Sequence, residues 1–493
     1  MVGLNRNPDP RIRTVGQFAL VVVAVLITLI AAAPFPQAAG AGSSKLAAAP
    51  SGGSTVTVQL RIHVGTVLGL ANAEFWGSAL YPIPQPNSTE AQEWSATGVR
   101  YALWPGGKAN DGYDVLTNVM YDANGTSSTP RGNLSSFVTW CETTGCHAII
   151  GLPGEINRPN VAAAEVSYIE KTLHFHAAFW EIGNEPGLWR DYKVPWAKWS
   201  ASKNSSITPL QYANLVHRYI AAIRAIDPKA RIIGLPGTGL GTYLESTYVY
   251  DTVKVNGQNL SAVALHIYPA GHLGAVNGTL SQFDQSLTGR TSLEGRVPLV
   301  REAIRSACAK CHPQVFVTEY NAATVGVLTN TGNYGMFMAG FDEVPYVAAE
   351  VTQGLTERVR NMDLWTFAGG YPGAMVASNG SARPLYYLYS TILPQLDLKA
   401  VQTNFSASVG QFFGVASVAG VSGSTAMTLL LVNANTTTGV RVDMVGSGFT
   451  LNAPTTTWSF ASGMSQPVVY GWGGVAPTSW VVGPESVLLV KVA

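Results

Sequence analysis

Two glutamates, each placed at the end of an apolar run, are the residues of this sequence best suited to do chemistry together. Glu185 closes the stretch FWEIGNEP at residues 179–186, and Glu319 lies in the stretch QVFVTEYNA at residues 314–322. Pro186 stops the first run, because proline lacks the N–H that a strand would donate. We therefore expect each carboxylate at the end of its own buried strand.

Two opposed carboxyl groups are what cleavage of a glycosidic bond requires. One is protonated and gives its proton to the leaving oxygen, while the other is ionised and attacks the anomeric carbon. We expect burial near Trp180, Trp189 and Tyr268 to raise the pKa of Glu185, and hydrogen bonds and positive groups to keep Glu319 ionised. In the simpler interpretation each glutamate only caps a strand. Two glutamates with adjacent Asn or Tyr residues favour the catalytic interpretation.

Eight short apolar runs alternate with helical patterns between residues 69 and 393. Residues 210–226 are typical of a helix, since Thr208 is a good N-cap, Pro209 suits the first turn and Asp227-Pro228 stops it. Strands that alternate with helices form a parallel sheet, and eight units predict an α/β fold of the (β/α)8 TIM-barrel type. A doubly wound open sheet is the alternative, but no glycine-rich phosphate loop follows a strand. The predicted strands are Ala71–Trp76, Val99–Leu103, His147–Leu152, Ala178–Ile182, Arg231–Leu235, Ala262–Ile267, Gln314–Thr318 and Asp363–Phe367.

The last hundred residues have a different pattern. From 394 to 493 helical periodicity gives way to short runs rich in Val, Thr, Ser and Gly, which predicts an all-β sandwich. Apolar and polar residues also alternate from Thr55 to Val64, ahead of the barrel. We expect residues 55–68 to form a strand that pairs with the sandwich.

The two glutamate motifs resemble those of clan A glycoside hydrolases, over spaced motifs from Ala71 to Phe367. EIGNEP at residues 181–186 is most similar to family 79, the heparanase and β-glucuronidase group. TEYN at residues 318–321 is closer to families 39 and 51, and the segment 104–114 (WPGGKANDGYD) also resembles family 51, which acts on arabinofuranosides. The resemblance implies a barrel joined to a β-sandwich.

The resemblance also implies roles for single residues. Glu185 would be the general acid/base and Glu319 the nucleophile. Asn184 would hydrogen-bond the 2-hydroxyl of the sugar, an interaction that strengthens in the transition state. His266 and Tyr268, within ALHIYP at residues 264–269, match the pair that orients the nucleophile. For His266 an ordinary buried histidine is the alternative.

Four further residues are candidates for binding the sugar. Trp365, at the end of the eighth predicted strand, would stack on a sugar ring or pack in the core. Gly106, Gly107 and Asp111 would bind the terminal sugar through backbone amides and a carboxylate, or form an ordinary turn. No basic cluster announces a site for a uronate.

Composition narrows the class of partner. Only 12% of the 493 residues are charged and the formal net charge is +1, without a long basic run, which argues against nucleic acid as a partner. A surface with so few ions loses few ion pairs in acid, so we expect tolerance of low pH. No metal or organic cofactor is implied, because an acid and a nucleophile suffice.

The N-terminus predicts export. Arg6, Arg11 and Arg13 precede an apolar run from Phe18 to Ala33, and small residues follow. Residues 1–41 therefore read as a cleaved signal peptide or as a retained membrane anchor, and 42–54 as a linker. Either way we expect an extracellular or cell-surface protein, attached to the membrane if the segment is retained.

The four cysteines fit an oxidising compartment. They form two sequence-local pairs, Cys141 with Cys146 and Cys308 with Cys311, for which two disulfides are the prediction and a zinc site the alternative. Glycosylation sequons are compatible with an external surface. They begin at Asn87, Asn124, Asn133, Asn204, Asn259, Asn277, Asn379, Asn404 and Asn435.

The sequence thus favours a retaining glycoside hydrolase that acts by double displacement on an extracellular oligo- or polysaccharide, with a β-glucuronide or related β-glycoside as a candidate substrate. An α-arabinofuranosidase or β-xylosidase is the near alternative. A non-catalytic carbohydrate-binding surface protein is the alternative of another class, but a binding module has no need of two opposed carboxylates.

Overall fold

The computed structural model describes most of the chain from residue 54 onward. The predicted leader or anchor (1–41) and residues 42–53 of the predicted linker lie outside the described residues, as do the sequons at Asn87, Asn124, Asn133, Asn204 and Asn277. Within the described part, no helix is long and apolar enough to cross a bilayer. The described residues are 54–80, 89–121, 127–128, 134–191, 207–238, 242–271, 285–322, 340–419, 426–445, 455–472 and 477–492.

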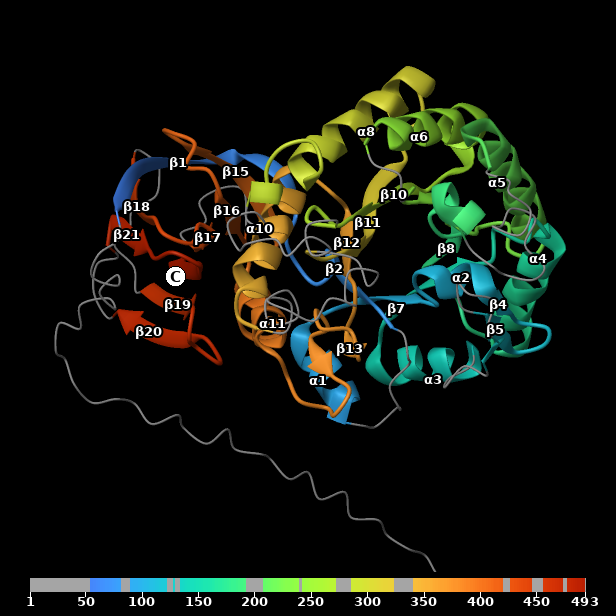
Figure 1. Cartoon of the computed structure of the whole chain (residues 1–493), viewed down its shortest axis with the longest axis horizontal. Coiled ribbons are helices and arrows are strands. Elements are labelled where there is room, and N and C mark those ends of the chain that lie inside the picture. Colours follow the sequence, from blue (N-terminus) through green and yellow to red (C-terminus); the bar gives the residue numbers. More distant parts are fainter. Residues whose placement is uncertain are drawn as a thin grey trace, which may run out of the picture. The chain divides into compact units, whose positions relative to one another are not determined.

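Eight parallel strands close into a barrel, as predicted (Figure 1). Each strand pairs with its neighbour in the sequence of units, and the last pairs with the first, so the barrel has no free edge. Nearly every strand residue is buried, because the interior is filled by side chains and the exterior is covered by helices. The barrel strands are β2 (Trp76–Ala79), β3 (Tyr101–Trp104), β7 (His147–Leu152), β8 (Phe179–Ile182), β9 (Ile232–Pro236), β10 (Ala262–Ile267), β11 (Gln314–Tyr320) and β12 (Asn361–Leu364).

The first and last barrel strands lie a few residues from their predicted positions. Residues 71–75 were predicted as strand but form a turn, in which the Asn72 side chain accepts the N–H of Glu74 and its carbonyl accepts the N–H of Phe75. Asparagine competes for the backbone in this way and so delays the strand until Trp76. The last strand was predicted over 363–367 and instead begins at Asn361 and ends at Leu364.

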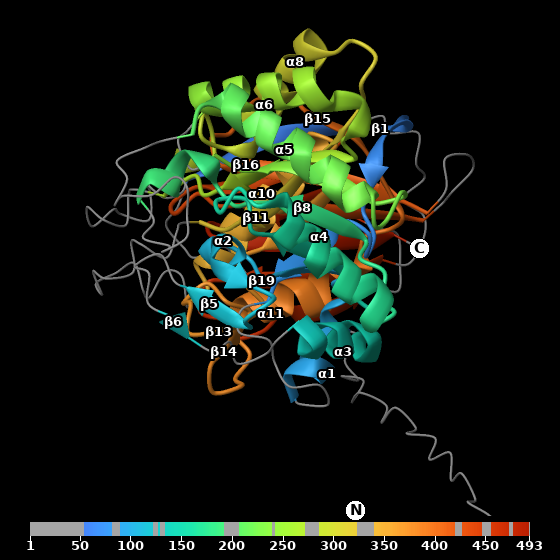
Figure 2. The same ribbon diagram turned by 90° about the vertical axis from the view of Figure 1, so that its right-hand side faces the viewer.

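Helices surround the barrel, as Figures 1 and 2 show. Helix α5 begins where predicted: the Thr208 hydroxyl accepts the N–H of Gln211, and the Gln211 side chain accepts the N–H of Thr208. This capping box satisfies donors that the first turn leaves unpaired. The helices are α1 (Thr89–Thr97), α2 (Lys108–Gly112), α3 (Leu134–Thr144), α4 (Pro159–Ser167), α5 (Pro209–Arg224), α6 (Thr242–Asn256), α8 (Leu293–Ala307), α10 (Glu343–Thr356) and α11 (Pro384–Tyr387); short strands are β4 (Tyr113–Asp114), β5 (Val119–Tyr121), β6 (Ser127–Ser128), β13 (Ala368–Gly369) and β14 (Val376–Ala377).

The C-terminal part is a sheet domain that includes the first described strand. β1 (Thr55–Leu70) pairs antiparallel with β15 and parallel with β18. Hydrogen bonds link nine strands in one sheet, which folds over so that β18 and β21 pack across β17 and β22 around a shared apolar core. The other strands are β15 (Lys399–Phe405), β16 (Phe412–Val418), β17 (Met427–Asn433), β18 (Gly439–Met444), β19 (Thr455–Ala461), β20 (Val468–Trp472), β21 (Ser479–Val482) and β22 (Ser486–Val492).

Helix α10 lies between the barrel and the sheet. Residues 343–355 are all buried, and the helix packs on β16, β17 and β22. Just before it, the Phe341 ring contacts Phe460 of β19 edge to face, with ring centroids 4.8 Å apart. A helix that is buried on every face needs neighbouring elements on all its sides. The sheet domain therefore completes the apolar core around the barrel.

Both predicted cysteine pairs are disulfides. Cys141 bonds Cys146 after α3, and Cys308 bonds Cys311 at the end of α8. The zinc alternative is thereby excluded for these cysteines, because none of the four thiols is free. Each disulfide closes a short loop at the C-terminal end of a helix, α3 or α8.

Substituting Phe460→Ala tests the packing between sheet and helix. Phe460 is fully buried, so its removal leaves a cavity that lowers the free energy of unfolding by about 3–5 kcal/mol. Urea unfolding followed by circular dichroism measures the loss. Val469→Ala on β20, where the side chain is 53% exposed, is the control and changes stability by less than about 0.5 kcal/mol. Equal effects of the two substitutions would contradict the packing described here.

Candidate active site

Glu185 and Glu319 both lie at the C-terminal mouth of the barrel. Glu319 belongs to β11, and Glu185 follows β8 by three residues. The backbone of Glu185 has a φ of 43°, in the left-handed region, and its N–H donates to the carbonyl of Pro236 at the end of β9, 3.0 Å away. A non-glycine residue is held in that region only by its surroundings. The turn after β8 thus fixes the direction of the Glu185 side chain.

His266 joins the two carboxylates. Its Nδ1 lies 3.2 Å from Oε1 of Glu185 and 3.4 Å from Oε2 of Glu319. The Tyr268 hydroxyl donates to the same Oε2 of Glu319 at 2.9 Å. Oε1 of Glu185 and Oε2 of Glu319 can therefore be no farther apart than the sum of their distances to Nδ1 of His266. That upper limit is about equal to the smallest separation of the two carboxyl groups in inverting glycosidases, where the range is ~6.5–9.5 Å. The four side chains predicted to work together are in one cluster.

Burial and charge compete at this cluster. Burial would lower the pKa of His266, but the carboxylates of Glu319 and Glu185 outweigh it and raise that pKa to about 9. Burial raises the pKa of Glu319 to about 7, although protonated His266, the Tyr268 hydroxyl and the Gly107 N–H all favour the ionised form. The partners expected to keep Glu319 ionised are present, but desolvation is the larger effect, contrary to our expectation. Only 6% of the Glu319 side chain is exposed, against 14% for Glu185.

Two further carboxyl groups lie inside the barrel, and the sequence analysis did not single them out. Burial raises the pKa of Glu181 on β8 to about 8, and that of Asp363 on β12 well above its usual range. Gly77 on β2 makes room for Asp363, because a Cβ at Gly77 would lie 1.5 Å from its Oδ1. A charged residue in the middle of an otherwise apolar strand, such as Glu181 in FWEI, was the available signal.

Asp111 does not line the mouth as predicted. Its side chain is fully buried, and its two oxygens accept N–H groups from the backbone of Gly154, Glu155 and Asn184 and from the Trp189 indole, at 2.8–3.1 Å. These donors leave no oxygen directed at a sugar. Asp111 instead fixes the loops after β7 and β8, including the residue next to Glu185.

The side-chain amide of Asn184 can donate a hydrogen bond to a ligand. Its backbone is held on both sides, since its N–H reaches Asp111 and its carbonyl accepts the Trp189 indole N–H at 2.7 Å. The side-chain amide nitrogen is buried and has no hydrogen-bond partner among the described residues. A buried donor without a partner costs stability unless a ligand or water supplies an acceptor.

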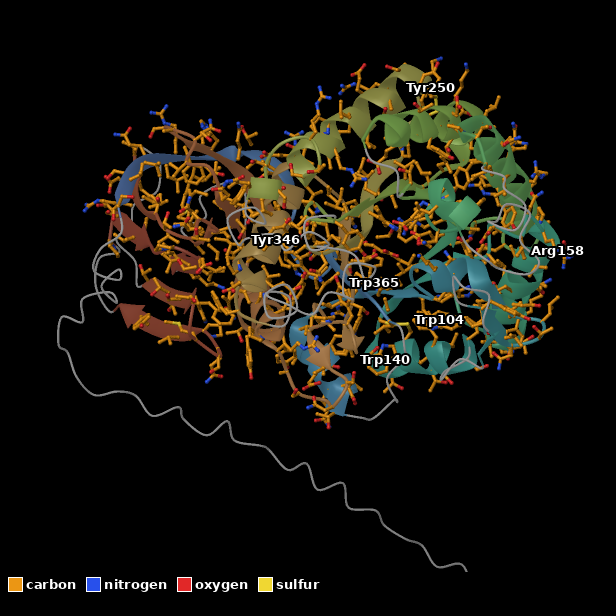
Figure 3. All side chains as sticks on the ribbon, in the orientation of Figure 1. Trp104, Trp140, Arg158, Tyr250, Tyr346 and Trp365 are labelled. Carbon is orange, nitrogen blue, oxygen red and sulfur yellow. A yellow bond between two sulfur atoms is a disulfide. The ribbon has the colours of Figure 1, made fainter. Side chains whose placement is uncertain are left out.

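Trp365 directly follows β12 and lies against the glycine pair. In Figure 3 it sits within the barrel region, while Arg158 and Tyr250 mark the outer helices. A Cβ on Gly106 or on Gly107 would lie 2.7 Å from the Trp365 ring, and Gly107 has a φ of 60°. The Asn321 side chain fixes the backbone of Trp365, donating to its carbonyl at 2.8 Å. Glycine is thus required at positions 106 and 107, because any side chain there would clash with the Trp365 indole.

A buried ion pair supports His266 from behind. Arg296 of α8 donates to the His266 carbonyl at 2.7 Å, and its guanidinium also binds both carboxylate oxygens of Glu245 on α6. A bidentate pair fixes the guanidinium geometrically. Neither residue stands out in the sequence, because each lies in an ordinary amphipathic helix.

In the described part of the chain, no group of three or more His, Cys, Asp or Glu residues is placed to hold a metal ion. What the cluster of Glu185, Glu319, His266 and Tyr268 offers is proton transfer and a buried carboxylate nucleophile.

Solved structures share this architecture. A family 51 arabinofuranosidase from Xanthomonas axonopodis pv. citri superposes with a TM-score of 0.69 at 15% identity, covering 89% of this chain and 100% of its own. A family 51 α-L-arabinofuranosidase from Bifidobacterium longum gives 0.69 at 13%, covering 88% and 99%. A family 44 xyloglucanase from Paenibacillus polymyxa gives 0.65 at 11%, covering 89% and 100%. The chain matches no protein-family model and no curated protein sequence. The barrel with its sheet domain is therefore the fold of known glycoside hydrolases.

Asp111→Asn tests the positioning role of this carboxylate. An amide in its place presents N–H groups to two of the four donors, so they lose their acceptor, and each donor left unsatisfied costs about 1–3 kcal/mol. Urea unfolding measures the loss. Asp114→Asn is the matched control, because Asp114 accepts one backbone N–H, from Leu116, and an asparagine oxygen replaces it. Equal stability of the two variants would refute the role.

The buried titratable groups predict that stability falls as pH rises. Glu319, Asp111 and Glu181 have pKa values of about 7, 7 and 8 in the folded protein, above their values in the unfolded chain. His266 is likewise raised, to about 9. A raised folded pKa stabilises the fold below the unfolded pKa, and this stabilisation is lost as pH rises through the folded value.

We therefore expect the free energy of unfolding to decline between about pH 5 and pH 8, by at least ~1.4 kcal/mol per pH unit, the slope for one such group. Urea unfolding at a series of pH values measures it. In Glu181→Gln, which mimics the protonated acid, the slope is shallower than in the wild type. A stability that is flat or rises over this range would contradict the assignment.

Proposed function

We propose that this protein is a retaining glycoside hydrolase with Glu185 as general acid/base and Glu319 as nucleophile. One observation carries the proposal: a single His266 nitrogen lies within 3.4 Å of both carboxylates, at the C-terminal mouth of a closed barrel. That distance favours the close carboxyl pair of retaining enzymes over the wider pair of inverting ones.

Double displacement assigns each residue a step. Ionised Glu319 attacks the anomeric carbon while Glu185 gives its proton to the leaving oxygen, and a glycosyl ester forms on Glu319. Glu185, now ionised, takes a proton from water as that water attacks the same carbon, and Glu319 leaves. The sugar is released with its original anomeric configuration, and both glutamates return to their starting states.

His266 and Tyr268 prepare Glu319 for this attack. The hydroxyl of Tyr268 donates to Oε2 of Glu319, and protonated His266 adds a positive charge beside it. Both favour the ionised nucleophile against the effect of burial. Asn184 would donate its free amide to the sugar 2-hydroxyl, and Trp365 would form an apolar floor for the sugar ring.

The substrate we favour is a terminal α-L-arabinofuranoside. The segment 104–114 resembles family 51, and the fold is shared with family 51 arabinofuranosidases. A β-glucuronide is the second candidate, because EIGNEP at residues 181–186 resembles family 79. The apolar segment at residues 18–33 supports export to the cell surface or beyond, where polysaccharides are encountered.

A panel of 4-nitrophenyl glycosides tests activity and substrate together. We expect release of 4-nitrophenol from the α-L-arabinofuranoside, and little from the β-D-glucuronide or β-D-xyloside. Proton NMR of the first-formed sugar tests retention. A product of inverted configuration would rule out double displacement, and inactivity on every glycoside would favour a binding protein.

Substitutions separate the two glutamates. Glu319→Gln abolishes turnover, and Glu185→Gln lowers it by about 10²–10⁴-fold, the usual contribution of a general acid. Azide restores product formation in Glu185→Ala as a glycosyl azide of retained configuration, and in Glu319→Ala as one of inverted configuration. Glu74→Gln, at the other end of the barrel, is the control with unchanged turnover. Full activity of either glutamate variant contradicts the assignment.

A further inference from the structure

A pocket of about 510 Å³ lies at the opposite end of the barrel from Glu185 and Glu319. Its walls come from the beginning of β11, the C-terminal end of α8, the segment between α10 and β12, and the last residues of β1. In a barrel of this type the N-terminal face usually contributes to stability, without chemistry. The pocket is therefore separate from the site described above.

The lining of this pocket is strongly basic. Arg301 and Arg305 of α8, Arg358 and Arg360 before β12, and His312 line it, and no acidic residue does. Only 12% of the whole chain is charged, with 30 lysines and arginines against 29 aspartates and glutamates. Four arginines around one concave surface are thus a local concentration of charge that the composition does not predict.

In the part of the chain that the structure describes, nearby carboxylates form ion pairs with only two of these arginines. Arg305 pairs with Glu302 at 2.5 Å, and Arg301 lies 3.7 Å from Glu357. Among the described residues, no carboxylate is within ion-pair distance of Arg358 or Arg360. Burial lowers the pKa of Arg301, Glu357 opposes this, and the positive charges of Arg358 and Arg305 lower it further. The guanidinium groups are close enough to repel one another.

Helix ends account for part of this pattern. Arg305 lies in the last turn of α8, and Arg358 follows the end of α10, where positive side chains are favourable. Two observations go beyond that account. Arg360 lies past the helix, just before β12, and Arg358 occupies the left-handed region with a φ of 55°, where glycine or asparagine is usual.

We propose that this pocket binds an acidic sugar unit of a polysaccharide, through its carboxylate or sulfate group. Guanidinium groups bind such anions by paired, parallel hydrogen bonds. The volume suits one or two sugar units. A single concave pocket without a basic stripe, on a chain of net charge +1, does not fit nucleic acid. The choice of a sugar among anions rests on the proposed function.

Binding of hexagalacturonate to the full chain tests the proposal, with a neutral xylohexaose for comparison. We expect the acidic oligomer to bind, more weakly as salt is raised, and the neutral one not to bind this pocket. The double substitution Arg358→Gln with Arg360→Gln weakens binding by about tenfold or more. Arg61→Gln with Arg441→Gln removes two arginines on the sheet domain and stays within about twofold of the wild type.

The same variants distinguish this proposal from the catalytic one. Neither double variant changes turnover of a small 4-nitrophenyl glycoside, because no substituted arginine lies at the catalytic mouth. Unchanged thermal midpoints show that both are folded. If the wild type has no glycosidase activity, the proposed function is wrong, but binding of the oligomer can still be measured.

Three outcomes would overturn the proposal. In the first, the two double variants bind hexagalacturonate equally well. In the second, inorganic phosphate or sulfate displaces the oligomer at equal anion concentration, so that the pocket takes any small anion. In the third, the wild type does not bind the oligomer but binds phosphatidylglycerol vesicles through Arg358 and Arg360, so that the ligand is a lipid surface.

Discussion

The site depends on one constraint: a protonated imidazole must share a water-poor barrel mouth with two carboxyl groups. His266 Nδ1 lies within 3.4 Å of Glu185 and of Glu319, and the histidine side chain is 2% exposed. Without that positive charge, two carboxylates so close would repel each other, and one would hold its proton more tightly. With it, Glu319 can be ionised although it is buried.

The surrounding structure keeps this arrangement rigid. Arg296 and Glu245 hold the backbone of His266 from the helix layer, and Asp111 holds the backbone next to Glu185. Neither Arg296 nor Asp111 is directed at a substrate. These two residues fix the positions of His266 and Glu185, and a shift of about an ångström in a reacting group can greatly reduce the reaction rate.

The sequence predicted the elements well and the supporting contacts poorly. Apolar runs identified the barrel strands, and the residues after them identified Glu185 and Glu319, because side chains at strand ends must meet at one mouth. Asp111 was misplaced, since its direction depends on loops from two other strands. The pKa of Glu319 was misjudged, because the depth of burial is a property of the closed barrel. The basic pocket was missed, since its arginines come from separate elements and form no run.

The position of β1 affects how the chain is made. This strand precedes the barrel in the sequence, yet its partners β15 and β18 follow the barrel. At ~5–20 residues per second, a ribosome needs some tens of seconds to make the intervening segment. Throughout that interval β1 offers a free edge to any neighbouring polypeptide. Nascent chains stalled within the barrel are therefore the ones in greatest need of a chaperone.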